Sequence, residues 1–294
     1  DTYGFVLKGD IELPAGIQLL TTTAYDGYDR LIDIDLDFSP VTLFQIVTKD
    51  EGWQFYQDVS FKGEFTKFPL TWEVGGWMMR EVLDVFVDVD LGAQAGVGVK
   101  YRDYEQTNWN AAGYLYLSYD FLDDFTLDGG VRYNWENKDL DFIAVPGATV
   151  QDRATWGIDH KDETWQAPTG TIRLTYRFRD DTHAFWKYTR GWKPGTFNAT
   201  ASQFSGVTVA DPETLDSFEA GVRGSWLDAR LGLDMSIFYY AYQDYQIFTA
   251  TQFLGGNPEF VILNANDAEV YGAEVEALGR PWEGALAIVR FSWL

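Results

Sequence analysis

The residues best suited to bind a ligand lie in one short stretch bounded by turn formers. Residues 191–197 read GWKPGTF. Glycine and proline favour turns, so this stretch is expected to be a connection, and it carries two large aromatic side chains and one cation. Trp192 and Phe197 offer flat stacking surfaces, and Lys193 offers a positive charge. The combination predicts contact with a bulky anionic ligand. A second interpretation, in which Trp192 and Phe197 only anchor the connection to the rest of the protein, stays open.

Three further candidates for ligand contact lie on other long connections. Tyr101 belongs to the connection at 81–105, and Arg153 and His160 belong to the connection at 138–163. If the 191–197 stretch does not hold the ligand, these connections are expected to do so.

The sequence offers few groups for metal binding. It has no cysteine and only two histidines, His160 and His183, so thiolate and multi-histidine sites are not expected. The acidic triplet 33, 35, 37 lacks the glycine and glutamate of an EF-hand, because Phe38 and Phe44 stand at those positions. The triplet alternates with apolar residues and predicts one polar strand face, as do the acidic residues at 84, 88 and 90. A looser calcium site in a loop stays open, and no metal or cofactor is predicted.

Catalysis is not predicted either. A serine hydrolase needs serine, histidine and carboxylate together, and neither His160 nor His183 lies near a serine in a suitable context. Glycosidase chemistry needs only two carboxylates, so in a chain with 45 acidic residues it cannot be excluded by counting. The expectation is nevertheless a protein that is not an enzyme.

Charge excludes further classes of function. The 294 residues carry 22 basic and 45 acidic side chains, a net charge of −23. Nucleic-acid binding needs a basic stripe, and binding to an anionic lipid surface needs basic residues too. The chain also carries 12 Trp, 17 Tyr and 21 Phe. So many aromatics either fill an unusually large core or face something other than water.

Long strands are expected to position all of these residues. From Phe125 to Trp135 apolar and polar residues alternate over eleven positions, which indicates a strand with one apolar and one wet face. A tilted strand of about 9–11 residues crosses a membrane. The pattern predicts twelve strands over residues 3–13, 16–25, 53–63, 70–80, 106–121, 125–137, 164–178, 182–190, 214–227, 230–250, 260–280 and 285–294.

The predicted connections alternate between short and long. Short ones lie at 14–16, 63–69, 123–124, 179–181, 228–229 and 281–284, and long ones lie at about 26–52, 81–105, 138–163, 191–213 and 251–259. Outer-membrane barrels sort their loops in this way, with short periplasmic turns and long extracellular loops. Aromatics beside the short turns, such as Tyr119, Phe121 and Phe125, are typical of an interfacial girdle. The predicted fold is an antiparallel transmembrane β-barrel, or a fragment of one.

Four phrases resemble the barrel of TonB-dependent outer-membrane receptors, in particular iron-siderophore receptors of Gram-negative bacteria. They are YTRGWKPGTFN at 188–198, PETLDSFEAG at 212–221, FYYAYQDY at 238–245 and NANDAEVYGAEVE at 264–276. The segment 16–137 is similar in layout.

The resemblance implies a role in the outer membrane. Such receptors have a 22-stranded barrel and an N-terminal plug domain that responds to TonB, and they import scarce ligands such as ferric siderophores. Nothing in this sequence resembles a plug, so residues 1–294 are expected to be about twelve strands of the family barrel, without the plug and the C-terminal strands. Two alternatives stay open: a plug-free, porin-like diffusion barrel and a soluble β-protein that binds glycans.

Overall fold

The computed structural model describes the whole chain except residues 36–37, 39–44, 91–99, 147–158, 200–206 and 252–258. In the part described, the chain consists almost entirely of β-strands, with one short 3₁₀ turn at Pro14–Gly16. No described helix is long and apolar enough to span a membrane.

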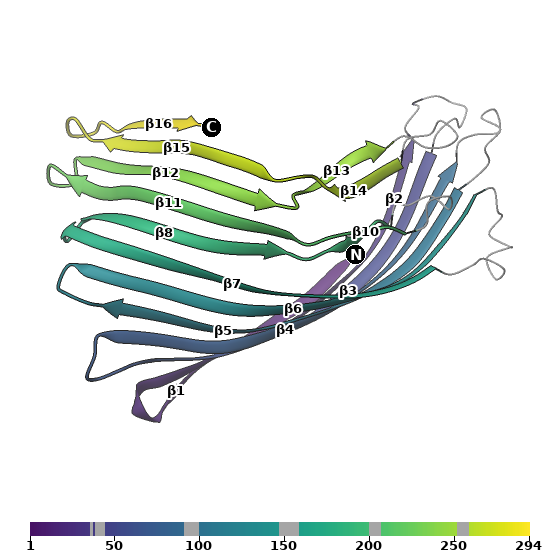
Figure 1. Cartoon of the computed structure of the whole chain (residues 1–294), viewed down its shortest axis with the longest axis horizontal. Helices are drawn as coiled ribbons and strands as arrows, with labels where there is room; N and C mark the ends of the chain where they lie inside the picture. Colours follow the sequence, from purple (N-terminus) through teal and green to yellow (C-terminus); the bar gives the residue numbers. More distant parts are fainter. Residues whose placement is uncertain (36–37, 39–44, 91–99, 147–158, 200–206, 252–258) are drawn as a thin grey trace.

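Twelve antiparallel strands form a single curved sheet in which sequence neighbours pair in order (Figure 1). The strands are Thr2–Leu13 (β1), Ile17–Asp35 (β2), Gln45–Glu64 (β3), Leu70–Asp90 (β4), Lys100–Asp120 (β5), Phe125–Pro146 (β6), Asp159–Arg179 (β7), Thr182–Lys193 (β8), Glu213–Trp226 (β11), Leu231–Gln243 (β12), Ala268–Gly279 (β15) and Ala287–Trp293 (β16). The predicted fold class, all-β and antiparallel with about twelve strands, is confirmed.

Two small ribbons stand apart from this sheet. Thr196–Phe197 (β9) pairs with Val209–Ala210 (β10), and Gln246–Thr251 (β13) pairs with Glu259–Asn264 (β14). Both ribbons lie where long connections leave the sheet, which we call the loop end; the opposite end, with the short connections, is the turn end (Figure 1).

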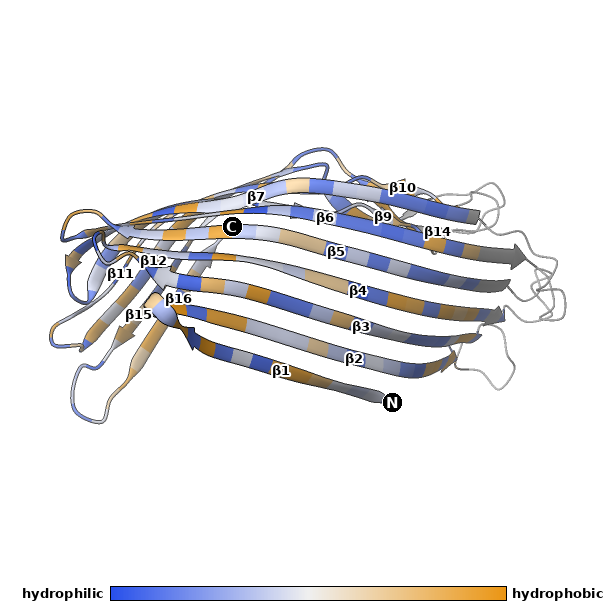
Figure 2. Cartoon of the chain, turned by 90° about the horizontal axis from the view of Figure 1, so that it is seen from below, coloured by the Kyte–Doolittle hydropathy of each residue, from blue (hydrophilic) through white to orange (hydrophobic). Residues whose placement is uncertain are grey.

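The sheet has one apolar and one polar face over much of its length. On β6, Val131 and Tyr133 are more than half exposed although apolar, whereas Arg132 and Asn134 on the other face are half-buried. We call the face of Val131 the outer face and the face of Arg132 the inner face. On β6 this pattern changes toward the loop end, where Figure 2 shows mostly hydrophilic residues.

Aromatic rings mark two levels on the outer face. Near the turn end, successive rings of Tyr119, Phe121, Phe125 and Tyr176 lie 6.2, 5.5 and 4.6 Å apart between centroids. This confirms that aromatics gather beside the short turns, and we call this group the turn-end belt. The second level lies toward the loop end. On β5 the first outward-facing aromatic beyond Tyr119 in that direction is Trp109, ten positions away, or about 33 Å along the strand. With the usual tilt of barrel strands this is about 25 Å across a membrane, the height of an outer-membrane apolar band.

Several predicted boundaries were wrong. Residues 230–250 form two strands, because the chain turns at Asp244, whose φ is 54°. Residues 260–280 likewise divide into β14 and β15. Strands β2 to β7 run well into the predicted long loops, and β4 alone spans 21 residues, about twice what a membrane crossing requires. The short connections lie where they were predicted.

Candidate functional site

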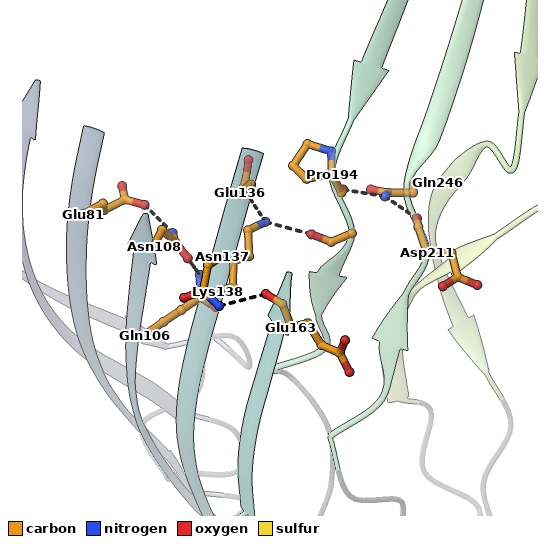
Figure 3. A network of polar contacts seen from close by, with 11 residues as sticks. Glu81, Gln106, Asn108, Glu136, Asn137, Lys138, Glu163, Pro194, Asp211 and Gln246 are labelled. Atoms are coloured by element: carbon orange, nitrogen blue, oxygen red, sulfur yellow. Dashed lines mark hydrogen bonds and ion pairs between the residues drawn. The ribbon is translucent and has the colours of Figure 1, made fainter. Parts of the chain in front are cut away.

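The inner face at the loop end is covered by connecting segments, and Lys138 of β6 lies at their centre. Its Nζ donates a hydrogen bond to the carbonyl of Gly195 over 2.9 Å and pairs with Glu136 Oε1 at 3.1 Å (Figure 3). The same ammonium lies 5.8 Å from the centre of the Trp165 ring. Both charged side chains are only 12% exposed. Lys138 therefore fixes the start of the β8–β11 connection on the wall formed by β6 and β7.

An apolar cluster completes this attachment. Leu140, Phe142, Phe197 and Val207 are all buried and pack together, with Trp165 against them. A Cβ added to Gly195 would lie only 2.5 Å from the Trp165 ring, so glycine is needed for the connection to approach that ring. The cluster supports the interpretation of Phe197 as an anchor of the loop.

Glutamine 246 joins this connection to the β13–β14 ribbon. Its Nε2 donates to the carbonyls of Pro194 and Asp211 at 2.9 and 2.8 Å (Figure 3), and Glu213 Oε2 accepts from its backbone N–H at 2.7 Å. Gln246 and Glu213 are both buried. Charge-assisted and backbone hydrogen bonds in such a setting hold two segments in one arrangement.

Asparagine 264 makes a second junction between the same two segments. Its Nδ2 donates to the carbonyls of Asp211 and Asp244, each at 2.8 Å, and its Oδ1 accepts from the Asp211 N–H at 2.7 Å. The two connections therefore form one continuous cap at the loop end, which we call the crown (residues 194–199, 207–213, 244–251 and 259–264).

The sequence of the whole chain fits one known family. The model of the family described as TonB dependent receptor-like, beta-barrel, matches residues 2–294. This chain belongs to that family. The resemblance seen in four phrases between residues 188 and 276 is confirmed, and the match extends over residues 2–294. The chain is therefore part of a TonB-dependent receptor barrel, and its place is the outer membrane of a Gram-negative bacterium.

Solved structures of similar fold include several metal-uptake proteins. The ferric yersiniabactin uptake receptor FyuA from Yersinia pestis superposes with a TM-score of 0.79 at 17% identity, covering 99% of this chain and 42% of that one. The siderophore receptor PiuA from Acinetobacter baumannii gives 0.71 at 16%, covering 99% and 46%. The copper transporter OprC gives 0.72 at 13%, covering 99% and 46%. At these identities the likeness shows the fold alone, and the chain spans less than half of each protein.

The exposed apolar outer face of the single sheet argues against the alternative of a soluble β-protein. A soluble β-sandwich would bury its apolar face against a second sheet, whereas Val131 and Ile237 of this receptor barrel are 65% and 63% exposed. Family membership and this exposure together show that the soluble interpretation was wrong.

The receptor barrel does not bring the predicted ligand-binding residues together. Trp192 and Lys193 are consecutive on β8, so they lie on opposite faces: Trp192 shares the outer face with Trp186, and Lys193 shares the inner face with Lys187. Lys193 is exposed and Trp192 is half-buried. Phe197 belongs to the crown itself and is buried against the inner face.

The remaining candidates lie elsewhere. Tyr101 is a strand residue of β5 rather than a loop residue, and its side chain lies outside the described part of the structure. Arg153 lies outside the described residues altogether. His160 is the second residue of β7 and is an outer-face residue beyond the level of Trp109.

His160 belongs to a small charged cluster on the receptor surface. Its Nδ1 lies 2.9 Å from Asp141 Oδ1, and its Nε2 lies 3.8 Å from Asp139 Oδ2. The hydrogen bond to Asp141 and the charge of Asp139 raise the pKa of His160 above its usual value. One ligand atom from each of the three residues could meet at a metal ion, since the atoms lie within 4.8 Å of one another. With both ring nitrogens facing carboxylates, the arrangement is that of an exposed ion-pair cluster.

Sequence reasoning missed Lys138, Trp165 and Gln246. For Lys138 a signal was present: Glu136 and Lys138 continue the alternation of Arg132 and Asn134, so extending the predicted strand 125–137 by a few residues would have placed Lys138 on the inner face. For Gln246 no such signal exists, because its partners are backbone carbonyls 35 and 52 residues away.

Proposed function

We propose that this chain forms the wall of a receptor for TonB-energised uptake of a ferric siderophore, with the TonB complex acting through a plug domain elsewhere in the protein. The family match over residues 2–294 is the observation that carries the proposal. Two structural neighbours, a ferric yersiniabactin uptake receptor and a siderophore receptor, support the choice of ligand class. In this proposal the loop end is extracellular, and the crown shapes the entrance through which the ligand reaches the inner face.

Uptake by cells tests this function directly. Iron-starved cells with and without the gene would be supplied with ⁵⁵Fe-labelled hydroxamate, catecholate and phenolate siderophores, in backgrounds with and without TonB. We expect one class to be taken up only when both the gene and TonB are present. Gene-dependent uptake that continues without TonB would instead support the porin-like diffusion barrel. No gene-dependent uptake of any class would contradict the choice of ligand.

Lys193 is the sequence-predicted residue best placed to contact an anionic chelate. It lies on the inner face at the loop end, is exposed, and continues the row of Lys187, whereas its neighbour Trp192 lies on the outer face. We therefore expect Lys193→Ala to weaken binding of the transported siderophore by severalfold, because losing a charged contact commonly costs about 1 kcal/mol or more. Trp192→Ala serves as the matched control and should leave affinity unchanged. The reverse result would place the ligand on the outer face and contradict this assignment.

A further inference from the structure

We propose that Arg80 binds a phosphate group of a lipid headgroup in the membrane leaflet at the loop end, the outer leaflet in the proposed orientation. Arg80 lies on the outer face of the sheet. It occupies the same alternate positions of β4 as Val74 and Met78, which are 44% and 40% exposed, and its cross-strand neighbours are Phe55 and Trp109. Its side chain therefore faces the membrane rather than the inner face.

Two indoles hold the Arg80 guanidinium. The guanidinium carbon lies 5.3 Å from the centre of the Trp53 ring and 5.0 Å from that of Trp109. Cations are attracted to the faces of indole rings at such distances. Trp53 in turn stacks on Tyr25 with centroids 6.1 Å apart, so Arg80 is part of an aromatic belt at the loop end, formed by Tyr25, Trp53 and Trp109.

The charge of Arg80 has no partner among the described residues. No hydrogen bond or ion pair to its guanidinium occurs in that part of the chain, and its buried Nε has no acceptor. Guanidinium groups remain protonated and offer five N–H donors. The charge therefore has no counter-charge within the described part of the chain, and the remaining N–H groups of the guanidinium can donate to an acceptor from outside it.

The level of Arg80 favours a headgroup over a solute. The outward positions of β4 between Arg80 and the turn end are Trp72, Val74, Gly76 and Met78, and none is charged. On β5 the outward positions between Trp109 and Tyr119 are Ala111, Gly113, Leu115 and Leu117, again without charge. Arg80 is therefore the first charge met at the loop-end edge of the apolar band, where lipid headgroups begin and aromatic belts form.

Phosphate is the anion that fits this position. A planar guanidinium binds phosphate through two parallel hydrogen bonds, and basic side chains beside membrane spans attract anionic headgroups. The nearest acidic residue on the same strand face, Asp84, lies four positions further out, or about 13 Å along the strand. It is too distant to neutralise Arg80, so the lipid supplies the counter-charge.

Arg190 provides a matched control for this proposal. It is also an arginine on the outer face, but its charge is already met within the chain: Arg190 Nη1 lies 3.5 Å from Asp216 Oδ2, and Tyr188 donates to the same carboxylate at 2.6 Å. It has no need of an external anion, so removing its charge should leave lipid binding unchanged.

Binding of defined lipids to the purified full-length receptor tests the inference. Native mass spectrometry from neutral detergent would measure affinity for diphosphoryl lipid A and for the same lipid without its phosphates. We expect Arg80→Gln to weaken binding of the diphosphoryl form by about tenfold or more, since hydrogen bonds between charged groups are involved. The dephosphorylated lipid should bind both proteins equally, and Arg190→Gln should behave as the wild type. These measurements need no siderophore, so they stand whether or not uptake is confirmed.

Three outcomes would overturn the proposal. Equal affinity of Arg80→Gln and wild type for diphosphoryl lipid A would show that Arg80 holds no phosphate. An equal loss for both lipids would show that Arg80 only orders the belt. Stabilisation by inorganic phosphate alone, lost in Arg80→Gln, would assign a free anion instead. If Arg80→Gln does not fold, as judged by heat-modifiable gel mobility, Arg80→Lys replaces it. This variant keeps the charge but not the bidentate geometry, and it should show an intermediate loss that is confined to the phosphorylated lipid.

Discussion

The side chain of Asn198 pairs with the backbone of Ile262 as a neighbouring strand would. Asn198 Nδ2 donates to the Ile262 carbonyl at 2.9 Å, and the Ile262 N–H donates to Asn198 Oδ1 at 2.7 Å. Asn198 Nδ2 also donates to Thr208 Oγ1 at 2.9 Å. One buried amide therefore joins the β9–β10 ribbon to β14, across 64 residues of sequence.

This pairing predicts that the two connections of the crown open together. In Asn198→Ala the Ile262 N–H and carbonyl lose their partner, and leaving buried groups unpaired costs about 1–3 kcal/mol. Amide hydrogen exchange should therefore rise in both the β9–β10 and the β13–β14 segments. Asn266→Ala, at an exposed position just before β15, is the control and should leave amide exchange slow in both segments. Faster exchange in only one of the two segments would show that they are not coupled.

The two faces of β12 should tolerate charge differently. Met235 is an exposed residue of the outer face near the middle of the strand, and its neighbour Ser236 lies on the inner face opposite Glu274. An arginine at the bilayer midplane of a barrel costs about 2–4 kcal/mol, so Met235→Arg should reduce the amount of folded receptor in the outer membrane. Ser236→Arg should be tolerated, because it faces water and a carboxylate. Equal yields of the two variants, measured by heat-modifiable mobility of membrane fractions, would show that these faces are not lipid and water.

The imidazole of His160 should remain protonated at pH values above those at which histidine usually loses its proton. Its raised pKa comes first from the hydrogen bond to Asp141 and then from the charge of Asp139. The ion pair is therefore complete below the pKa of an unfolded histidine and is lost as pH rises through the higher folded value. In a His183→Gln background, the titration of the single imidazole by NMR should move to lower pH in Asp141→Asn. No movement would mean that Asp141 does not hold the imidazolium.

The sequence predicted the membrane part of the fold better than the part beyond it. Between Phe125 and Trp135 the outer face meets lipid and the inner face meets water, so apolar and polar residues alternate as expected for a strand. Further along β6 the environments of the two strand faces are reversed. Asp139 and Asp141 face outward into water, while Leu140 and Phe142 face inward against the crown. The apolar side of the strand therefore changes, and the segment 138–163 was interpreted as a loop although β6 and β7 extend into it.

The candidate site was only partly predictable for a related reason. The connection at 191–197 was recognised from its turn formers and aromatics, and Phe197 does anchor it. What that connection packs against could not be read from the sequence, because the contacts are made by Trp165 of another strand and by Gln246, Asn198 and Asn264, which bind backbone groups. Backbone partners leave no pattern in the sequence, and the coming together of distant segments depends on the curvature of the sheet.

The central claim is that the sheet spans the outer membrane with its loop end outside. Labelling on either side of the membrane-spanning part of β5 tests this claim most directly. The chain has no cysteine, so single-cysteine variants at exposed Glu105 and exposed Asp123 give unambiguous sites on either side of the apolar band. In intact cells a bulky polyethylene-glycol maleimide should modify Glu105→Cys and leave Asp123→Cys unmodified until the outer membrane is permeabilised. Modification of Asp123→Cys in intact cells, with or without Glu105→Cys, would contradict the account.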